Sequence, residues 1–322
     1  MTQAPLADNA LRPRPARFLA TAAACVGLLA AFVPAAEAQD HVHDHAEGPA
    51  EHLAFDRPES WVLAHFASAT LLSGLEGPRA VRAGEVTIGF ELAWLPPLDA
   101  AQRRVGFNGI KEEDLNKAPF LPRPRVSVGL PWKVTATVAA TPPIRLFGVK
   151  AALVAVGLER PMIETPRWTV GLRGYGQLGW VRSDFTCPSS VVAFEPGSAG
   201  NEYGCQAPSS DTASLRYAGG EASLAYTPAS SRVSPHLAIG VTRMDVGFEV
   251  DALTFGLSDH AHHVSRGTTV SGSGGISLRL TTRAALSIDV FYSPLSVRRT
   301  AGAPVTTDGF LNARALVTYR LR

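Results

Sequence analysis

The chain has 322 residues, 46% of them hydrophobic and 18% charged, with a formal net charge of +2 at pH 7. This balance gives no electrostatic basis for binding nucleic acid, so we expect no nucleic-acid partner. Beyond the N-terminal region no apolar run is long enough for a transmembrane helix, although the mean hydropathy is positive.

Residues 1–38 predict a secretory signal peptide. Arg12, Arg14 and Arg17 supply a basic start, residues 18–33 are apolar, and an Ala-x-Ala cleavage pattern ends at Ala38. The apolar run of about 16 residues is shorter than the roughly 20 that a retained membrane helix needs. The mature chain is therefore expected to be exported.

Two segments precede the first predicted strand. Residues 39–57 are polar and rich in His, which predicts a disordered lead. Residues 58–84 are interpreted as a short helix and a linker, because Pro58 and Glu59 are typical of a helix start and Gly74 of a stop. This helix, from Trp61 to about Leu72, would plug a barrel or lie at its mouth; an additional strand is the alternative.

From residue 85 onward apolar and polar side chains alternate. Trp168, Val170 and Leu172 share one parity and Thr169 and Gly171 the other, as in a strand with one apolar and one polar face. Ten strands are predicted in this way: Glu85–Leu95, Arg123–Leu130, Trp132–Thr141, Lys150–Glu159, Arg167–Asp184, Ala213–Thr227, Pro235–Asp251, Thr268–Leu280, Ala285–Val297 and Phe310–Leu321. The apolar parity changes within the seventh strand, which predicts a β-bulge near Thr242 and Arg243.

The connections and the aromatic residues indicate a membrane. Long and short connections alternate, as in barrels with long external loops and short periplasmic turns. Aromatic residues lie near strand ends on the apolar parity: Trp94, Trp180, Phe248 and Tyr292 toward the outer end, and Trp132, Trp168, Tyr226 and Tyr319 toward the inner end. Residues 85–322 are therefore predicted to form an all-β fold, a ten-stranded antiparallel transmembrane β-barrel in the bacterial outer membrane. A soluble sandwich or lipocalin-like barrel with a dry core is the alternative.

Two segments carry a family resemblance. The strand–turn–strand pattern of residues 226–240 and the closing segment of residues 315–322 resemble Gram-negative outer-membrane β-barrel proteins. The resemblance implies outer-membrane lipid and the barrel-assembly machinery as partners. Members of that superfamily typically end in Phe or Trp, whereas this chain ends in Leu321 and Arg322.

The polar parity supplies a candidate charged network inside the barrel. Its members are three acids and three bases: Glu91, Arg173, Glu221, Arg279, Asp289 and Arg314. Side chains nearly fill the interior of a barrel of about ten strands, so these charges are expected to pair and to pack the lumen. The alternative is a narrow pore lined by both signs of charge.

Histidine and cysteine suggest two further features. The His-rich segments contain His41, His43 and His45 in the lead and His260, His262 and His263 in an external loop. Imidazole and carboxylate ligands suit Zn or Cu, and a solvated tail and loop are the alternative; no other cofactor is predicted. The two segments are expected on opposite sides of the membrane. Cys187 and Cys205 are predicted to form a disulfide, since Cys25 leaves with the signal peptide.

The leading functional prediction is a channel or transporter for small solutes, including hydrophobic ones. The alternative is a closed structural or surface-interaction barrel that acts through its external loops, chiefly residues 187–205 and 253–266. An enzyme is not expected. Outer-membrane proteases of the omptin type carry paired acids and an Asp–His pair at the rim, whereas Asp259 and His260 are neighbours in one loop and no acid pair accompanies them.

Overall fold

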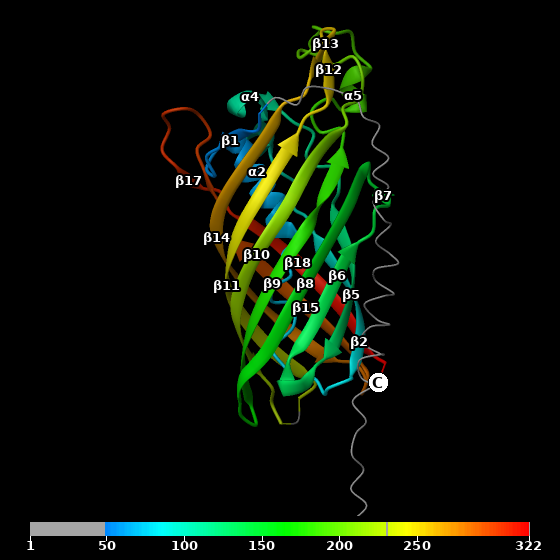
Figure 1. The fold of residues 1–322 in the computed structure, drawn as a ribbon, viewed down its shortest axis with the longest axis vertical. Coiled ribbons are helices and arrows are strands. Elements are labelled where there is room, and N and C mark those ends of the chain that lie inside the picture. The colour runs from blue at the N-terminus through cyan, green and yellow to red at the C-terminus, as the bar shows by residue number, and fades with distance from the viewer. Residues whose placement is uncertain (1–48, 230, 322) are drawn as a thin grey trace, which may run out of the picture. The chain divides into compact units, whose positions relative to one another are not determined.

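The computed structural model describes residues 49–229 and 231–321, in which ten antiparallel strands close into a barrel (Figure 1). In chain order they are β2 Val86–Trp94, β5 Phe120–Gly129, β6 Thr135–Thr141, β8 Val149–Glu164, β9 Trp168–Ser183, β10 Asp211–Tyr226, β11 Val233–Glu249, β14 His262–Arg279, β15 Ala284–Ser293 and β18 Phe310–Arg320. Each strand pairs with its neighbour in this order, and β18 pairs with β2 to close the circle. The ten-stranded prediction is confirmed, because a period of two is a strong signal when it recurs in every segment.

Short turns follow β5, β8, β10 and β14, and longer connections follow the other strands. The longer connections contain α3 Ala100–Arg103, β3 Arg104–Val105, α4 Gly106–Gly109, β4 Lys111–Glu112, β7 Arg145–Leu146, α5 Ser189–Val192, β12 Ala252–Thr254, β13 Leu257–Asp259, β16 Ser296–Val297 and β17 Thr306–Thr307; one short turn contains the 3₁₀ helix η1, Pro131–Lys133. By the rule for such barrels, the long-loop end is the outer end and the short-turn end is the periplasmic end.

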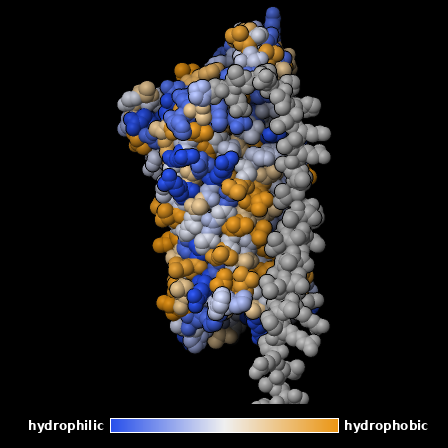
Figure 2. All heavy atoms as spheres, viewed as in Figure 1, coloured by the Kyte–Doolittle hydropathy of each residue, from blue (hydrophilic) through white to orange (hydrophobic). Residues whose placement is uncertain are grey.

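The outward face of the strands carries an apolar belt. Leu237 and Ile239 on β11 and Leu178 on β9 point outward, and Ile239 is 71% exposed. Figure 2 shows apolar side chains gathered over the lower part of the strands and polar ones above them. On β18 the apolar outward residues run from Leu311 to Tyr319, which matches the roughly 9–11 residues that a strand needs to cross a bilayer. A soluble barrel would hide these side chains.

Aromatic side chains border this belt. Trp94 and Tyr292 are exposed toward the outer end, and Trp132, Trp168 and Tyr319 toward the periplasmic end. The placement of Phe248 is wrong, because its side chain packs against the interior core. No helix in residues 49–229 or 231–321 is both long and apolar enough to span a bilayer.

A helix fills the lumen toward the outer end. The predicted helix is present as α2, Pro58–Ala69, and it contacts β10, β11 and β18 (Figure 1). Trp61, Val62 and Leu63 lie on different sides of the helix and all are buried. A helix that is buried on all sides requires a surrounding wall, which the barrel strands supply.

The chain passes through the barrel before it forms the first wall strand. Within the lead that was predicted to be disordered, Glu51–Leu53 form β1, which pairs in parallel with β14 near His263 at the outer end. After α2 the chain continues to the periplasmic end, where the Gly84 amide donates to the Gly129 carbonyl at 2.8 Å. The segment from residue 49 to residue 85 therefore runs from the outer end to the periplasmic end.

The bulge predicted in β11 is wrong. The register of β11 with β10 and β14 continues without a shift through Thr242 and Arg243. The apolar parity changes because Met244 and Val246 face α2 inside the barrel, while Arg243 lies outside above the apolar belt. The irregularity of the wall lies instead in β8, between Pro161 and Ile163.

Candidate functional site: the plugged lumen

A buried carboxylate on β2 binds two arginines of β5. Glu91 lies opposite Arg123 in the strand register, and both side chains are 1% exposed. Arg123 donates from Nε to Glu91 Oε2 at 2.8 Å and from Nη2 to Oε1 at 3.0 Å, while Arg125 Nε donates to Oε2 at 2.7 Å. Such bidentate contacts compensate the desolvation of the charges.

The sequence reasoning missed both arginines of β5. Both lie within the predicted strand Arg123–Leu130, where they flank Pro124. Pro124 lies on the outward parity, and the arginines share the inward parity of Ser127. This shared parity is the sequence signal that identifies them as lumen residues.

A second buried pair joins β15 to β18. Arg314 donates to Asp289 Oδ1 from Nη2 at 2.7 Å and from Nε at 3.2 Å. Asp289 Oδ2 lies 3.7 Å from Nε2 of His236, a β11 residue that the sequence reasoning did not select. These side chains are at most 1% exposed.

A third group spans three adjacent strands. Arg173 on β9 donates from Nη1 to Glu221 Oε1 on β10 at 2.8 Å, and its Nη2 binds Glu159 on β8. The register places Glu159, Arg173 and Glu221 side by side across the sheet. Of the six predicted network residues, five form ion pairs inside the barrel; Arg173 is half-buried and the other four are buried.

Arg279 lies apart from the network. It is at the periplasmic end of β14, where its guanidinium is exposed and donates to the Ser231 carbonyl at 3.2 Å. The prediction that Arg279 lies on the polar face of its strand is correct. This end of β14 extends beyond the plugged part of the lumen toward the periplasm, so the side chain contacts water rather than the buried acids.

The buried charges bind the end of the lumen helix. Arg123 donates to the carbonyls of Thr70 and Leu71, and Arg314 Nη1 donates to the Leu71 carbonyl and to Ser73 Oγ, both at 3.3 Å. The last carbonyls of a helix have no partners within the helix and carry partial negative charge. The two arginines therefore satisfy both the acids of the wall and the helix terminus.

Neutral and acidic groups complete the contact between the helix end and the wall. The Tyr217 hydroxyl donates to the Thr70 carbonyl at 2.7 Å and accepts from the Leu72 amide at 3.1 Å. The Gly74 amide donates to Glu221 Oε1 at 3.0 Å. We call residues 58–74, which include α2 and its bound end, the plug.

A small polar cavity lies next to the plug. It has a volume of about 30 Å³ and is lined by Leu72, Glu76, Arg125, Glu159 and Arg173 among others. This volume is enough for one or two water molecules. The charged network therefore packs the lumen at this level.

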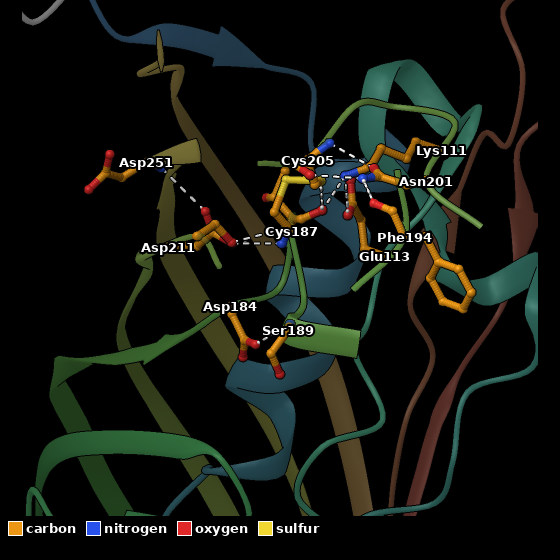
Figure 3. Close-up of a disulfide and its surroundings, with 12 residues drawn as sticks. Lys111, Glu113, Asp184, Cys187, Ser189, Phe194, Asn201, Cys205, Asp211 and Asp251 are labelled. Carbon is orange, nitrogen blue, oxygen red and sulfur yellow. Dashed lines mark hydrogen bonds and ion pairs between the residues drawn. A yellow bond between two sulfur atoms is a disulfide. The ribbon is translucent and has the colours of Figure 1, made fainter. Parts of the chain in front are cut away.

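At the outer end a disulfide holds one long loop. Cys187 and Cys205 are bonded, as predicted, with their Cα atoms 5.6 Å apart (Figure 3). Next to the bond, Asp211 accepts from the Thr186 amide at 2.7 Å, and the Asn201 side chain binds the backbone of Cys205. The loop of residues 184–210 is thus fixed to the top of β10.

A buried lysine of the loop of residues 95–119 ties that loop to the disulfide loop. Lys111 Nζ donates to Glu113 Oε2 at 2.8 Å and also to the Thr186 carbonyl (Figure 3). Burial raises the pKa of the Glu113 carboxyl to about 7, although the nearby ammonium favours its charged form. Lys117 adds a second bridge between the two loops through Asp184, at 2.8 Å.

The histidines of the external segment each lie beside a different acid. The N–O distances are 3.6 Å for His260 and Asp251, 3.9 Å for His262 and Glu249, and 3.2 Å for His263 and Glu51. Within residues 49–229 and 231–321 no three metal-ligating side chains converge.

Metal binding by these histidines stays a prediction. His41, His43 and His45 and the predicted signal peptide lie outside the described residues. The contact between Glu51 and His263 shows that the end of the lead meets the barrel at its outer end, so the expectation of opposite sides is wrong for this part of the lead.

No protein-family model and no curated protein matches the chain. Among solved structures it is similar to the attachment invasion locus protein Ail of Yersinia pestis, with 11% identity over 74% of this chain and all of that one and a TM-score of 0.27. It is similar to Neisserial surface protein A, with 12% identity, 73% and 95% coverage and a TM-score of 0.28. The outer membrane protease OmpT of Escherichia coli gives 7% identity, 74% and 92% coverage and a TM-score of 0.36.

The expectation that the chain is not an enzyme is overturned by these similarities, because an outer-membrane protease is among the barrels it is similar to. Sequence neighbours such as Asp259 and His260 give no ground for excluding catalysis on such a scaffold. Transport is likewise not established by the fold. The closed ten-stranded barrel and its apolar belt are those of a transmembrane β-barrel of the bacterial outer membrane.

Proposed function

We propose that this protein is a closed outer-membrane barrel that binds a partner through the loop surface at its outer end. The observation that carries the proposal is the plug, whose end is held by Arg123, Arg314 and Tyr217 inside a wall that it fills. A barrel with a filled lumen leaves its loops as the part available to other molecules.

The start of the plug is held as firmly as its end. The Trp61 indole donates to the Asp308 carbonyl at 2.8 Å, and the Arg299 guanidinium lies 4.2 Å from the centre of the Trp61 ring. Arg299 also binds the Asp308 carboxylate. The loop between β15 and β18 therefore closes over α2 and ties the plug to the outer end.

The outer loops form one connected surface. The β12–β13 hairpin lies on the disulfide loop, because the Gln206 amide donates to the Leu253 carbonyl at 2.9 Å and the Phe255 amide to the Gly204 carbonyl at 3.0 Å. Together with the hydrogen bond from Lys111 to the Thr186 carbonyl, these bonds join three loops into a surface that is organised before a partner binds. Preorganisation reduces the entropy lost on binding.

Large apolar side chains project from this surface. The most exposed of them are Phe107, Ile110, Phe194, Phe255 and Leu257, which we call the apolar tips. Phe107 and Phe255 each adopt a φ of 48°, a conformation that costs about 1–2 kcal/mol for a residue with a Cβ. Exposed apolar groups held in strained backbone support an interaction site.

Conductance tests the closed lumen. The purified full-length protein, inserted into a planar lipid bilayer, is expected to give no stable conductance steps, because the plug blocks the path. Steady ion conduction by the unmodified protein would contradict the closed barrel.

Retention of a protein partner tests the loop surface. The barrel in lipid nanodiscs is used as bait for proteins exposed at the surface of the same cells, beside the variant Phe107→Ser/Phe255→Ser/Leu257→Ser. A partner is expected to bind the unmodified protein and to be lost with the variant, whereas Glu202→Gln, an exposed polar position on the neighbouring disulfide loop, serves as the matched control. Equal retention by all three baits would refute a role for the apolar tips.

Transport of a small solute remains the second candidate, and it requires the plug to move. The polar cavity beside Arg125 and Glu159 supports it, because it places space on the periplasmic side of the plug. In that case Arg123→Met/Arg314→Met should conduct while the unmodified protein is silent, since the variant lacks the guanidiniums that bind the helix end. A silent variant that folds normally speaks against gating by the plug.

A further inference from the structure

We propose that the periplasmic mouth of the barrel is a binding site for a phosphate-bearing anion. A cavity of about 280 Å³ opens there, and five arginines line it: Arg79, Arg232, Arg279, Arg283 and Arg320. Among the residues that the structure describes, Glu76 is the only acid in its lining. We call this cavity the arginine mouth.

The fold brings these arginines together from distant parts of the chain. Arg79 belongs to the linker that follows the plug, and Arg320 ends the last strand. The Arg279 amide donates to the Arg232 carbonyl, and the Arg320 amide to the Arg283 carbonyl, both at 2.8 Å. Backbone pairing therefore fixes four of the five side chains around one opening.

The positive charge of the arginine mouth is only partly compensated. Arg320 binds Glu85 at 3.0 Å, and Arg79 lies 3.8 Å from Glu76. Two acids for five arginines leave three positive charges, and among the described residues no acid lies within ion-pair distance of Arg232 or Arg283. Like charges repel one another, so an anion stabilises such a cluster.

The side-chain chemistry fits phosphate. A guanidinium presents a planar set of N–H donors that binds phosphate oxygens in pairs, and several guanidiniums surround a group with more than one charge. Threonine hydroxyls, including those of Thr87, Thr281 and Thr318, line the same cavity and add donors. The arginine mouth is large enough for a small anion, with room for its hydrating water.

A bound anion would touch the segment that leads to the plug. Residues 76–79 form part of the cavity wall, and Glu76, Thr87 and Thr318 also line the smaller cavity beside the plug. The arginine mouth therefore shares wall residues with the small cavity that lies next to the charged network. The site is separate from the outer loops, so its failure would leave the proposed surface function standing.

Calorimetric titration with inorganic diphosphate tests the site. The full-length protein is held in nanodiscs of phosphatidylcholine at low salt, where binding with one site per barrel is expected. The affinity should fall at least about tenfold, or about 1.4 kcal/mol, in Arg279→Gln/Arg283→Gln. The matched control is Arg243→Gln/Arg266→Gln, on the outward face of β11 and β14 toward the outer end, which should bind as the unmodified protein does.

Two results would overturn the site: absence of diphosphate binding to the unmodified protein at low salt, or equal weakening in the control variant. Arg283→Gln alone, at an exposed turn position, is a milder variant and should still weaken binding several-fold. A second arm adds phosphatidylglycerol to the nanodiscs. Loss of diphosphate binding there assigns the natural phosphate to a lipid headgroup, and unchanged binding assigns it to a soluble anion; both uphold recognition of phosphate.

Discussion

Replacing Arg314 by Met should destabilise the folded barrel by about 3–5 kcal/mol, because it leaves the Asp289 carboxylate buried without its partner. Arg314 donates twice to Asp289 and once each to Leu71 and Ser73. The bonds to the helix end are 3.3 Å long, so the orphaned carboxylate dominates the loss. His236, at 3.7 Å, is too distant to replace the guanidinium.

The double variant Asp289→Asn/Arg314→Met separates this cause from a simple loss of packing. Removing both charges should recover at least half of the lost stability, since the penalty comes from an unpaired buried charge. Arg266→Met is the matched control: its pair with Asp245 is exposed, so its cost should stay below about 1 kcal/mol. Urea unfolding in lipid vesicles, followed by tryptophan fluorescence, measures all three. A double variant no more stable than Arg314→Met would refute the reasoning.

Three further outcomes follow from the loops and the lipid-facing wall. The variant Cys187→Ser/Cys205→Ser lacks the disulfide, which joins residues 18 positions apart, and its free energy of unfolding should fall by about 3 kcal/mol. Chymotrypsin should then cut the loop faster at Phe194 and Tyr203, and unchanged cleavage rates would contradict this. Because the folded pKa of Glu113 lies above 4.5, the folded state holds its proton more tightly. Stability from this group is therefore complete below pH 4.5 and falls by about 3 kcal/mol as the pH rises through 7, and Glu113→Gln should remove that dependence in unfolding or amide-exchange measurements. Ile239→Arg, on the exposed apolar belt, should cost about 2–4 kcal/mol in vesicle unfolding, whereas a cost near zero would place this face in water.

The wall of the barrel could be predicted from the sequence because its signal is local and repeated. In β9 the alternation of Trp168, Val170 and Leu172 with polar residues gives both the strand and the face that meets lipid. Cysteine count and spacing were likewise enough to pair Cys187 with Cys205. The strand pattern and the cysteine pair can be read from the types of residues and their spacing along the chain, without knowledge of the three-dimensional fold.

Features that depend on what fills the barrel could not be predicted in this way. The inward residues of β11 are polar near the periplasmic end and apolar at Met244 and Val246, and only the position of α2 explains the change. The same holds for the hydrogen bonds from Arg123 to the helix end, because a strand pattern does not reveal which backbone carbonyls lie across the lumen. The bulge in β11 was inferred from a change of environment that the sequence does not distinguish from a change of register.

Charge balance distinguishes the two polar regions of this barrel. The network at the plug holds four acids and four bases, Glu91, Glu159, Glu221 and Asp289 with Arg123, Arg125, Arg173 and Arg314, all joined by ion pairs. Buried charges that neutralise one another need no ligand and serve to hold the plug and the wall together. The arginine mouth is in contact with water and has five bases for two acids, so three of its positive charges have no acidic partner in the folded protein. We therefore assign the neutral network to closing the barrel and the uncompensated mouth to binding.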